Sequence, residues 1–333
     1  MLREYTSAFG VSGCEKEIRE IIKDKVKELG ETRIDKMGNL ILHKVGTGKR
    51  VMLAAHMDEI GFIITKICED GRIKFEPVGG IDPRILISKR VVFGRTKQIG
   101  VIGSKPIHLQ SNAERFTPIA LKDLFIDIGA KNKEEVKKYV KLGDYATFDS
   151  EYVDMGNFIK AKALDDRVGC AIITDVFSED FKLDLYGAFT VQEEVGTRGA
   201  GVVAFSVEPE IAIIIEGTTC ADFAKEEKDH VTTSGWGPAI SILDRSSSAS
   251  EVLLKLVCEV ADKHQIPYQL RRGIVGGNDA GTISRSRAGC LTIAISVPTR
   301  YIHSPISMIN KNDYNNTLRL VKLVLKSLEE GEI

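Results

Sequence analysis

The sequence predicts an α/β fold: a mixed sheet covered by helices, with a small β-barrel inserted into it. Apolar, strand-like runs alternate with segments of helical periodicity towards both ends of the chain, which is typical of a helix-covered sheet. Between residues 66 and 160 the pattern changes to short β-branched runs and Gly-rich turns with four prolines. The 333 residues also exceed the roughly 250–300 at which single cores stop growing. We therefore expect a discontinuous main domain, residues 1–65 and 161–333, and an inserted β-rich domain, residues 66–160.

The first part of the chain predicts one helix, a hairpin and a central strand. Ser12-Gly-Cys-Glu15 has the spacing of a capping box, and apolar residues then recur at helical spacing as far as Gly30. Met37-Gly38-Asn39 predicts a hairpin turn. The nearly all-apolar run Val51-Met-Leu-Ala-Ala55 predicts a central strand that is buried on both faces. This first α/β piece is expected to end near Thr65.

The rest of the chain divides into the insert and a return of the α/β pattern. Within the insert, runs such as Arg90-Val-Val-Phe93 and Ile99-Gly-Val-Ile102 predict short strands, and one short helix is expected at residues 133–142. After residue 161 we expect strands near 185–191, 211–215 and 291–297, and helices near 167–178, 249–264 and 312–329.

Charge and composition exclude several classes of protein. With 46 basic and 47 acidic residues the net charge is -1, so the chain offers no electrostatic footprint for nucleic acid or an anionic membrane. It shows neither a secretory apolar segment nor the ~20 consecutive apolar residues of a membrane span. The six cysteines are widely spaced without a Cys-x-x-Cys pair and are expected to be free thiols. We expect a cytoplasmic protein without nucleic acid or membrane partners.

Five strand-like runs end in residues of the types that bind metal ions. The carboxyl ends of parallel strands meet at one crevice, so residues scattered along the sequence can converge there. The side chains that follow these runs are His56 with Asp58, Asp165, the pair Glu193-Glu194, Glu216, and His303. The pattern therefore predicts a hydrolase that binds two metal ions.

The charges of these residues suit two divalent ions. If His56 and His303 are neutral, the protein supplies three negative charges, from Asp165, Glu194 and Glu216, against four positive ones. One bridging hydroxide would bring the sum to zero and would also be the nucleophile. Asp165 suits the position of the carboxylate shared by both ions.

Two further carboxylates have expected roles beside the metal ligands. Glu193 is the candidate general base, because it adjoins Glu194 and could take a proton from the attacking water and return it to the leaving amine. Asp58 is placed to accept the second ring N–H of His56, which would fix the tautomer of that ring.

These motifs resemble those of the tetrahedral aminopeptidases, two-metal peptidases that are sometimes labelled cellulases. The resemblance covers nearly the whole chain, and the motifs that carry it are Ala55-His-Met-Asp-Glu-Ile-Gly61, Gly79-Gly80, Lys162-Ala-Leu-Asp-Asp-Arg167, Gln192-Glu-Glu-Val-Gly196, Gly277-Asn-Asp-Ala280 and Arg300-Tyr-Ile-His-Ser-Pro305. It implies a zinc-peptidase-like fold and assigns the same roles: metal ligands His56, Asp165, Glu194, Glu216 and His303, general base Glu193, and supporting carboxylate Asp58.

The resemblance implies several further properties. The peptide between Asp165 and Asp166 is expected to be cis, and the two metal ions are expected to be zinc or cobalt, with manganese as a third option. The insert is expected to mediate dimers that assemble into a hollow dodecamer. The chain departs from the family at Glu216, where many members carry Asp, which leaves the denticity of this ligand open and makes Asp222 a rival for it.

We therefore expect a metal-dependent aminopeptidase that releases N-terminal residues from oligopeptides. The alternatives are a related carboxypeptidase or N-deacylase, which would need a cationic residue in the pocket, and a catalytically silent assembly scaffold. A cellulase finds no support, because the chain has a single tryptophan, Trp236, and no run of sugar-stacking aromatics. Gln269-Leu-Arg-Arg-Gly273 is interpreted as a solvated edge, and Gly276-Gly277-Asn278-Asp279 as a tight turn at the active site.

Overall fold

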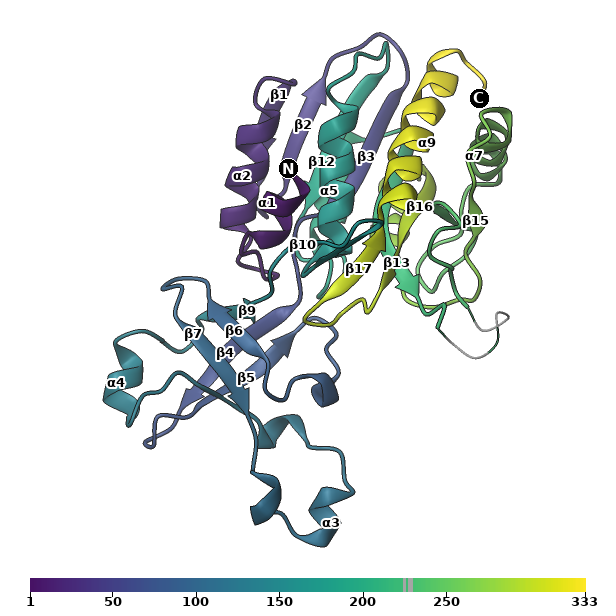
Figure 1. Ribbon diagram of the computed structural model, residues 1–333. Helices are drawn as coiled ribbons and strands as arrows, with labels where there is room; N and C mark the ends of the chain where they lie inside the picture. Colours follow the sequence, from purple (N-terminus) through teal and green to yellow (C-terminus); the bar gives the residue numbers. More distant parts are fainter. Residues whose placement is uncertain (224–225, 227–229) are drawn as a thin grey trace.

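The largest unit of the molecule is a mixed sheet with four parallel strands at its centre. The computed structural model describes residues 1–223, 226 and 230–333, and within these residues eleven strands join in one sheet (Figure 1). In spatial order they are β1 (Glu31–Ile34), β2 (Leu40–Lys44), β12 (Asp184–Thr190), β3 (Arg50–His56), β13 (Ile211–Cys220), β16 (Leu291–Arg300), β17 (Ser307–Asn310), β11 (Phe158–Ala161) and β10 (Val153–Asp154), with β14 (Ala239–Ser241) beside β16 and β15 (Gln269–Leu270) beside β14. The parallel set is β12, β3, β13 and β16, and antiparallel strands extend it on both sides.

Helices cover both faces of this sheet, because side chains of each central strand alternate between two apolar cores. In β3, Val51 and Leu53 belong to the larger core, whereas Met52 and Ala54 belong to the smaller one. The larger core is covered by α1 (Leu2–Ser7), α2 (Lys16–Val26), α5 (Leu164–Val176), α7 (Glu251–Lys263) and α9 (Lys311–Glu329), and the smaller one by α6 (Arg198–Val207) and α8 (Asp279–Ile283). The predicted sheet covered by helices is confirmed.

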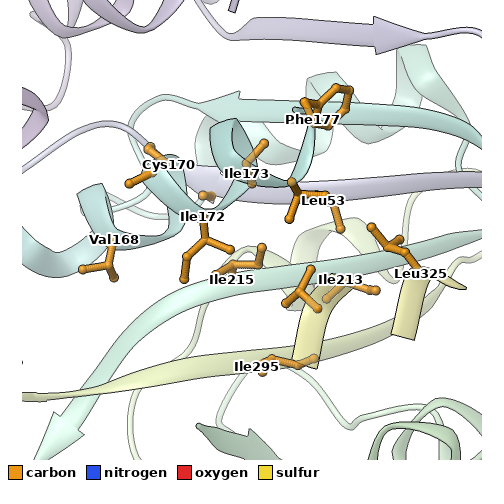
Figure 2. Packing of buried hydrophobic residues seen from close by; sticks show 14 of the residues in the cluster. Leu53, Val168, Cys170, Ile172, Ile173, Phe177, Ile213, Ile215, Ile295 and Leu325 are labelled. Carbon is orange, nitrogen blue, oxygen red and sulfur yellow. The ribbon is translucent and has the colours of Figure 1, made fainter. Parts of the chain in front are cut away.

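Helix α5 packs directly across the central strands. Figure 2 shows Ile172 and Ile173 of this helix close to Leu53 of β3 and Ile215 of β13, and all four side chains are buried. Complete burial of such a side chain stabilises the fold by about 1.5–3 kcal/mol relative to its exposure. The packing therefore fixes the start of α5, which carries Asp165, against the strands that carry the other candidate ligands.

A closed β-barrel lies at one end of the sheet (Figure 1). Its strands, in order around the barrel, are β4 (Gly61–Ile67), β5 (Ile73–Val78), β8 (Phe125–Asp127), β7 (Ile99–Gly103), β6 (Arg90–Phe93) and β9 (Tyr145–Phe148). Phe62 meets Phe75 and Phe148 edge to face in its interior, so side chains fill this small barrel. The predicted barrel is confirmed.

Three local predictions are wrong. Ser12 and Glu15 form no capping box: α2 begins at Lys16 without a side-chain cap, and the Ser12 hydroxyl donates to Asp58 instead. A short helix, α1, precedes the one expected to open the chain. Besides α4 (Lys133–Lys137), the barrel segment carries a second helix, α3 (Asn112–Arg115), which is too short to show a helical period.

Short 3-10 turns complete the barrel segment, at Pro83–Ile85, Ile107–Leu109 and Leu121–Asp123. Among the described residues, the helices are all too short or too polar to cross a membrane.

Candidate metal centre

The candidate ligands lie together at the carboxyl ends of the parallel strands. His56 ends β3, Glu216 lies within β13, and Glu194 and His303 follow β12 and β16. Asp165 joins them from the first turn of α5. Asp165, Glu194, Glu216 and His303 line a pocket of about 560 Å³. His56 does not line it, because its side chain is almost completely buried. The structure thus brings together all five residues that the sequence analysis selected.

Asp165 lies between the two imidazole rings. Its Oδ1 is 3.3 Å from His56 Nε2, and its Oδ2 is 3.6 Å from His303 Nε2. His303 Nε2 is also 3.3 Å from Glu194 Oε2. A carboxylate with one oxygen directed at each of two imidazole ligands has the arrangement required of a shared ligand for two ions.

Among the described residues, two groups of three side chains could each hold a cation, and both contain His56. One consists of His56, Asp165 and Glu194, and the other of His56, Asp166 and Glu216, with ligand atoms within 4.8 Å of one another in each. Asp166 was not among the expected ligands. Its Oδ1 accepts the backbone N–H of Gly169 at 3.0 Å, which caps the regular part of α5. The Asp165–Asp166 peptide is cis, as the family resemblance implies.

Buried oxygens without donors indicate that the cluster suits cations. Glu216 Oε1 and Asp166 Oδ2 are both buried and accept no hydrogen bond in the structure. Such atoms are costly to bury unless a donor or a cation compensates them. The residues present therefore fit a divalent metal centre, whose hard oxygen and imidazole donors are those that zinc, cobalt and manganese accept.

Burial, and after it the charges of neighbouring carboxylates, shifts the pKa values of this cluster. Burial raises the pKa of Glu194 to about 7, and burial also raises those of Glu193 and Glu216. Burial alone would lower the pKa of His303, but contact with Asp165 and the nearby charge of Glu194 raise it to about 9. The cluster therefore holds protons in place of the positive charge that a bound ion would supply.

Asp58 supports the site differently from the sequence-based expectation. The His56 Nδ1 atom is 3.2 Å from the backbone carbonyl of Asp58 and 3.5 Å from its carboxylate. The carboxylate of this buried residue instead accepts the backbone N–H groups of Glu193, at 3.0 Å, and Glu194, at 3.2 Å. It also accepts the Ser12 hydroxyl at 2.6 Å. Asp58 therefore positions the Glu193-Glu194 pair as well as the imidazole.

A turn of the barrel also reaches the site. His303 Nδ1 lies 3.0 Å from the carbonyl oxygen of Gly80, just after β5. A Cβ at Gly80 would lie 3.2 Å from that ring nitrogen, and Gly79 has a φ of +86°, which favours glycine. The Gly79-Gly80 motif is thus explained by the close approach of the barrel to His303.

The rival ligand Asp222 does not join the cluster. Its two oxygens accept Arg300 Nε at 2.7 Å and Arg300 Nη2 at 2.6 Å, and it is absent from the lining of the site pocket. Glu216 is therefore the carboxylate that β13 brings to the site.

The sequence analysis misinterpreted one charged residue of the site, Arg271, and placed another, Asp279, in a turn at the active site without assigning it a role. Arg271 was interpreted as part of a solvated edge, but it lines the pocket and its Nε donates to Thr218 Oγ1 at 2.9 Å. Asp279 is buried and accepts the Thr190 hydroxyl at 2.6 Å, and burial raises its pKa to about 6. The Asn278-Asp279 turn was the only signal for Asp279, whereas nothing in the local sequence marked Arg271.

A larger cavity of about 1010 Å³ adjoins the site pocket. The two share Ile302 and His303. Ile85 of the barrel segment and Met308 of β17 both line this second cavity. His303 therefore stands between the site pocket and a wider space bordered by the barrel.

A mostly buried group of carboxylates and imidazoles at the strand ends of a helix-covered sheet defines a class of proteins, the metal-dependent hydrolases built on an α/β sheet. Residues 38–320 match the family described as M42 glutamyl aminopeptidase. A lysyl aminopeptidase of Pyrococcus furiosus is 32% identical over 342 aligned residues, which cover 99% of this chain and 97% of that protein. The chain belongs to the peptidase M42 family and is a peptide hydrolase.

Solved structures of similar proteins confirm the fold. A TET aminopeptidase from Thaumarchaeota archaeon SCGC AB-539-E09 superposes with a TM-score of 0.94 at 34% identity, covering 100% of this chain and 98% of that one. The Pyrococcus horikoshii TET1 peptidase, which can assemble into a tetrahedron or a large octahedral shell, gives 0.87 at 34% identity and covers 97% of both chains. The resemblance to tetrahedral aminopeptidases is confirmed.

Proposed function

We propose that the protein is an aminopeptidase that releases N-terminal residues from oligopeptides with two divalent metal ions. The proposal depends on one observation, the convergence of Asp165, Glu194, Glu216 and His303 at one pocket, with the buried His56 beside Asp165, in a cluster in which carboxylates outnumber cations. When bound, the ions would polarise the scissile carbonyl and lower the pKa of the attacking water.

Glu193 is the residue to which we assign proton transfer. It lines the pocket beside Glu194, and its backbone is held by Asp58. Burial raises the pKa of its carboxyl above the ordinary value, which is the direction that makes it a stronger base. Glu193 would take a proton from the attacking water and deliver it to the leaving amine.

The two cavities suggest how a peptide would lie. The small pocket beside Glu193 would take the N-terminal residue, and the larger cavity beyond His303 would take the residues that follow. If the small pocket takes a single residue, cleavage would be restricted to the first peptide bond.

We also propose that the barrel segment, residues 66–160, mediates self-association into dimers and from these into a dodecamer. Similar TET peptidases form such assemblies. Ile107, Leu109 and Phe116 are mostly exposed on the excursion around α3, which extends away from the rest of the molecule (Figure 1). A second copy would remove this apolar surface from water. Light scattering at micromolar concentration tests the assembly, and a monomer would contradict it.

Metal analysis and an aminoacyl substrate panel test the proposed activity. We expect about two divalent ions per chain, hydrolysis of aminoacyl-p-nitroanilides, loss of this activity on chelation, and its return with zinc, cobalt or manganese. Protein that binds metal but cleaves none of the substrates would contradict the proposal.

Arg271 favours a second candidate function. A carboxypeptidase or N-deacylase needs a cation that binds a substrate carboxylate, and Arg271 lines the pocket. Peptides with a blocked N-terminus separate the two: an aminopeptidase leaves them intact, whereas a carboxypeptidase cleaves those with a free C-terminus.

A further inference from the structure

Four apolar side chains beside His303 belong to no core of the molecule. Tyr301, Ile302 and Ile306 lie on the turn between β16 and β17, and Met308 lies on β17; all four line the larger cavity. Among the described residues, none of the four packs into either core of the sheet or into the barrel interior. Tyr301 is 50% exposed and Ile306 is 42% exposed. Apolar surface left uncovered beside a site is typical of a surface that binds an apolar ligand.

The position of these side chains relative to the candidate ligands suits the second residue of a peptide. Ile302 directly precedes His303, and both residues line the site pocket as well as the larger cavity. In a peptide whose first residue lies in the site pocket, the Cα atom of the second residue is only about 3.8 Å from that of the first. The second side chain would therefore enter the larger cavity beside Ile302.

The charged side chains of the larger cavity balance one another. Besides His303, three basic and three acidic residues line it: Lys89, Arg90 and Lys160, and Asp82, Asp149 and Glu151. Arg90 forms an ion pair with Asp149, and Lys160 Nζ donates to the carbonyl oxygen of Glu151 at 2.8 Å. These residues provide no excess charge that would select an acidic or a basic side chain, so the apolar side chains decide what the cavity takes.

We propose that the larger cavity binds a large apolar side chain on the second residue of the peptide, with Ile302, Ile306 and Met308 as its walls. This inference rests on the proposed aminopeptidase function and names a substrate class for it. A leucine or phenylalanine side chain would leave water together with the protein side chains that it covers. The flexible thioether of Met308 can adapt to either shape. The substrate is the favoured occupant because the cavity is continuous with the site pocket.

The first test compares tripeptide amides that differ only in their second residue. The first residue is the best one found with the aminoacyl panel, the third is glycine, and the second is Leu, Phe, Ala or Glu. On metal-loaded wild type we expect Leu and Phe to exceed Ala in kcat/KM by about 10-fold, because part of their additional apolar surface would be buried.

The double variant Ile306→Thr/Met308→Thr tests the walls of the cavity at two positions outside the cores. It should lower the ratio of kcat/KM for Leu over Ala by about 5- to 10-fold. Leu291→Thr is the matched control, because Leu291 is 41% exposed, begins β16 at the end away from the ligands and lines neither cavity. It should leave the ratio unchanged. Circular dichroism and metal content confirm that each variant remains folded and loaded.

A second measurement reports binding without turnover. Peptides whose first amide is replaced by a CH2–NH linkage cannot be hydrolysed at that bond. In calorimetry with the metal-loaded protein, such a peptide with Leu as its second residue should bind more tightly than one with Ala. The difference should vanish in Ile306→Thr/Met308→Thr and persist in Leu291→Thr.

The outcomes separate this inference from the proposed function. Equal hydrolysis of the Leu and Ala peptides, or a preference that survives in the double variant, would overturn the inference and leave the aminopeptidase intact. A preference for Glu over Leu would show that Lys89 and Lys160 select the residue, and the inference would be wrong. It would also be wrong if wild type showed no preference and the double variant differed in mass by light scattering, because the apolar side chains would then contact a second copy. Failure to cleave every aminoacyl and peptide substrate would refute the proposed function, and equal binding of the two CH2–NH peptides would then refute the inference independently.

Discussion

Asp58 and Glu59 are neighbours in the chain, yet they belong to two buried charged clusters of opposite character. Asp58 supports the candidate metal centre, in which carboxylates dominate and buried oxygens of Glu216 and Asp166 lack hydrogen-bond donors. Glu59 belongs to a second cluster, with Lys162 and Arg167, at the junction of the sheet and the barrel.

In the junction cluster every carboxylate oxygen has donors. Glu59 accepts Lys162 Nζ at 2.7 and 2.8 Å, the Gly10 N–H at 3.0 Å and the Thr147 hydroxyl, from barrel strand β9, at 2.9 Å. Arg167 Nη2 adds a second cation 3.7 Å away. Positive charge therefore exceeds negative charge here, whereas the opposite holds at the metal centre.

This difference in charge balance indicates what each cluster does. A buried charge is tolerated when the protein pairs it, and the Glu59 carboxylate is paired within the chain, although Nε and Nη2 of Arg167 have no hydrogen-bond acceptor among the described residues. At the metal centre the chain leaves the positive charge to be supplied from outside, so that cluster is built for binding rather than for stability. The predictions below test this distinction.

The largest expected effect is on catalysis. Glu193→Gln should lower kcat by about 10²–10⁴-fold, because the amide cannot accept the proton, while metal content and Tm stay close to wild type. Rates on an aminoacyl substrate and metal analysis provide the measurement. Near-normal turnover would remove Glu193 from the proton-transfer role.

A substitution in the junction cluster should lower stability rather than catalysis. Lys162→Met leaves the Glu59 carboxylate buried without its main cation and should lower the free energy of unfolding by about 3–5 kcal/mol, with activity per folded molecule retained. Denaturant unfolding measures the loss. The double variant with Glu59→Leu should recover part of it, and a double variant as unstable as the sum of the singles would contradict the pairing.

Chelated protein should lose stability as the pH rises. The folded-state pKa of Glu194 is raised from 4.5 to about 7 and that of His303 from 6.5 to about 9, so the folded state binds more protons than the unfolded state across this range. Stability is therefore full below about pH 4.5 for Glu194 and below about 6.5 for His303, and it declines as the pH rises through 7 and 9. The loss from Glu194 is on the order of 2–3 kcal/mol, and that from His303 is smaller because its side chain is 40% exposed and solvent screens its charge.

Added metal should reverse this trend, because metal binding requires deprotonated ligands and strengthens as the pH rises. Thermal unfolding with and without metal from pH 5 to 9 makes the comparison. A Tm of chelated protein that is constant or rises over this range would argue against the acid-rich cluster.

The smallest effect is expected at Ser12. Its hydroxyl is one of three donors to Asp58, so Ser12→Ala should cost about 1 kcal/mol and leave the two backbone N–H donors in place. Denaturant unfolding measures the change, and activity should fall only slightly. A loss of catalysis comparable with that of Glu193→Gln would show that Ser12 has a larger role.

The sequence predicts those parts of the molecule whose structure follows from the local pattern of residues. Strands such as β3 are uniformly apolar because both faces are buried, and their ends show polar residues because the crevice lies there. The five candidate ligands could therefore be selected before their distances were known. Their roles as ligands of two ions stay a prediction.

The parts that could not be predicted depend on contacts far apart in sequence. Ser12 has the local pattern of a cap, but it bonds with Asp58, 46 residues away. Arg271 sits in a charged, Gly-flanked segment that looks solvated, and only the folding of the loop onto β13 buries it. Lys162 and Glu59 likewise show no sign of pairing in the sequence, because 103 residues separate them.

Because Gly80 contacts His303, the barrel could not be exchanged for another one without affecting the position of this imidazole. A chimaera that takes its barrel from another family member would have to keep the Gly79-Gly80 turn in register with the imidazole, whereas the remote excursion around α3 carries no such constraint. Evolution could therefore alter the surface at the far end of the barrel, and with it the size of an assembly, without disturbing the chemistry at the near end.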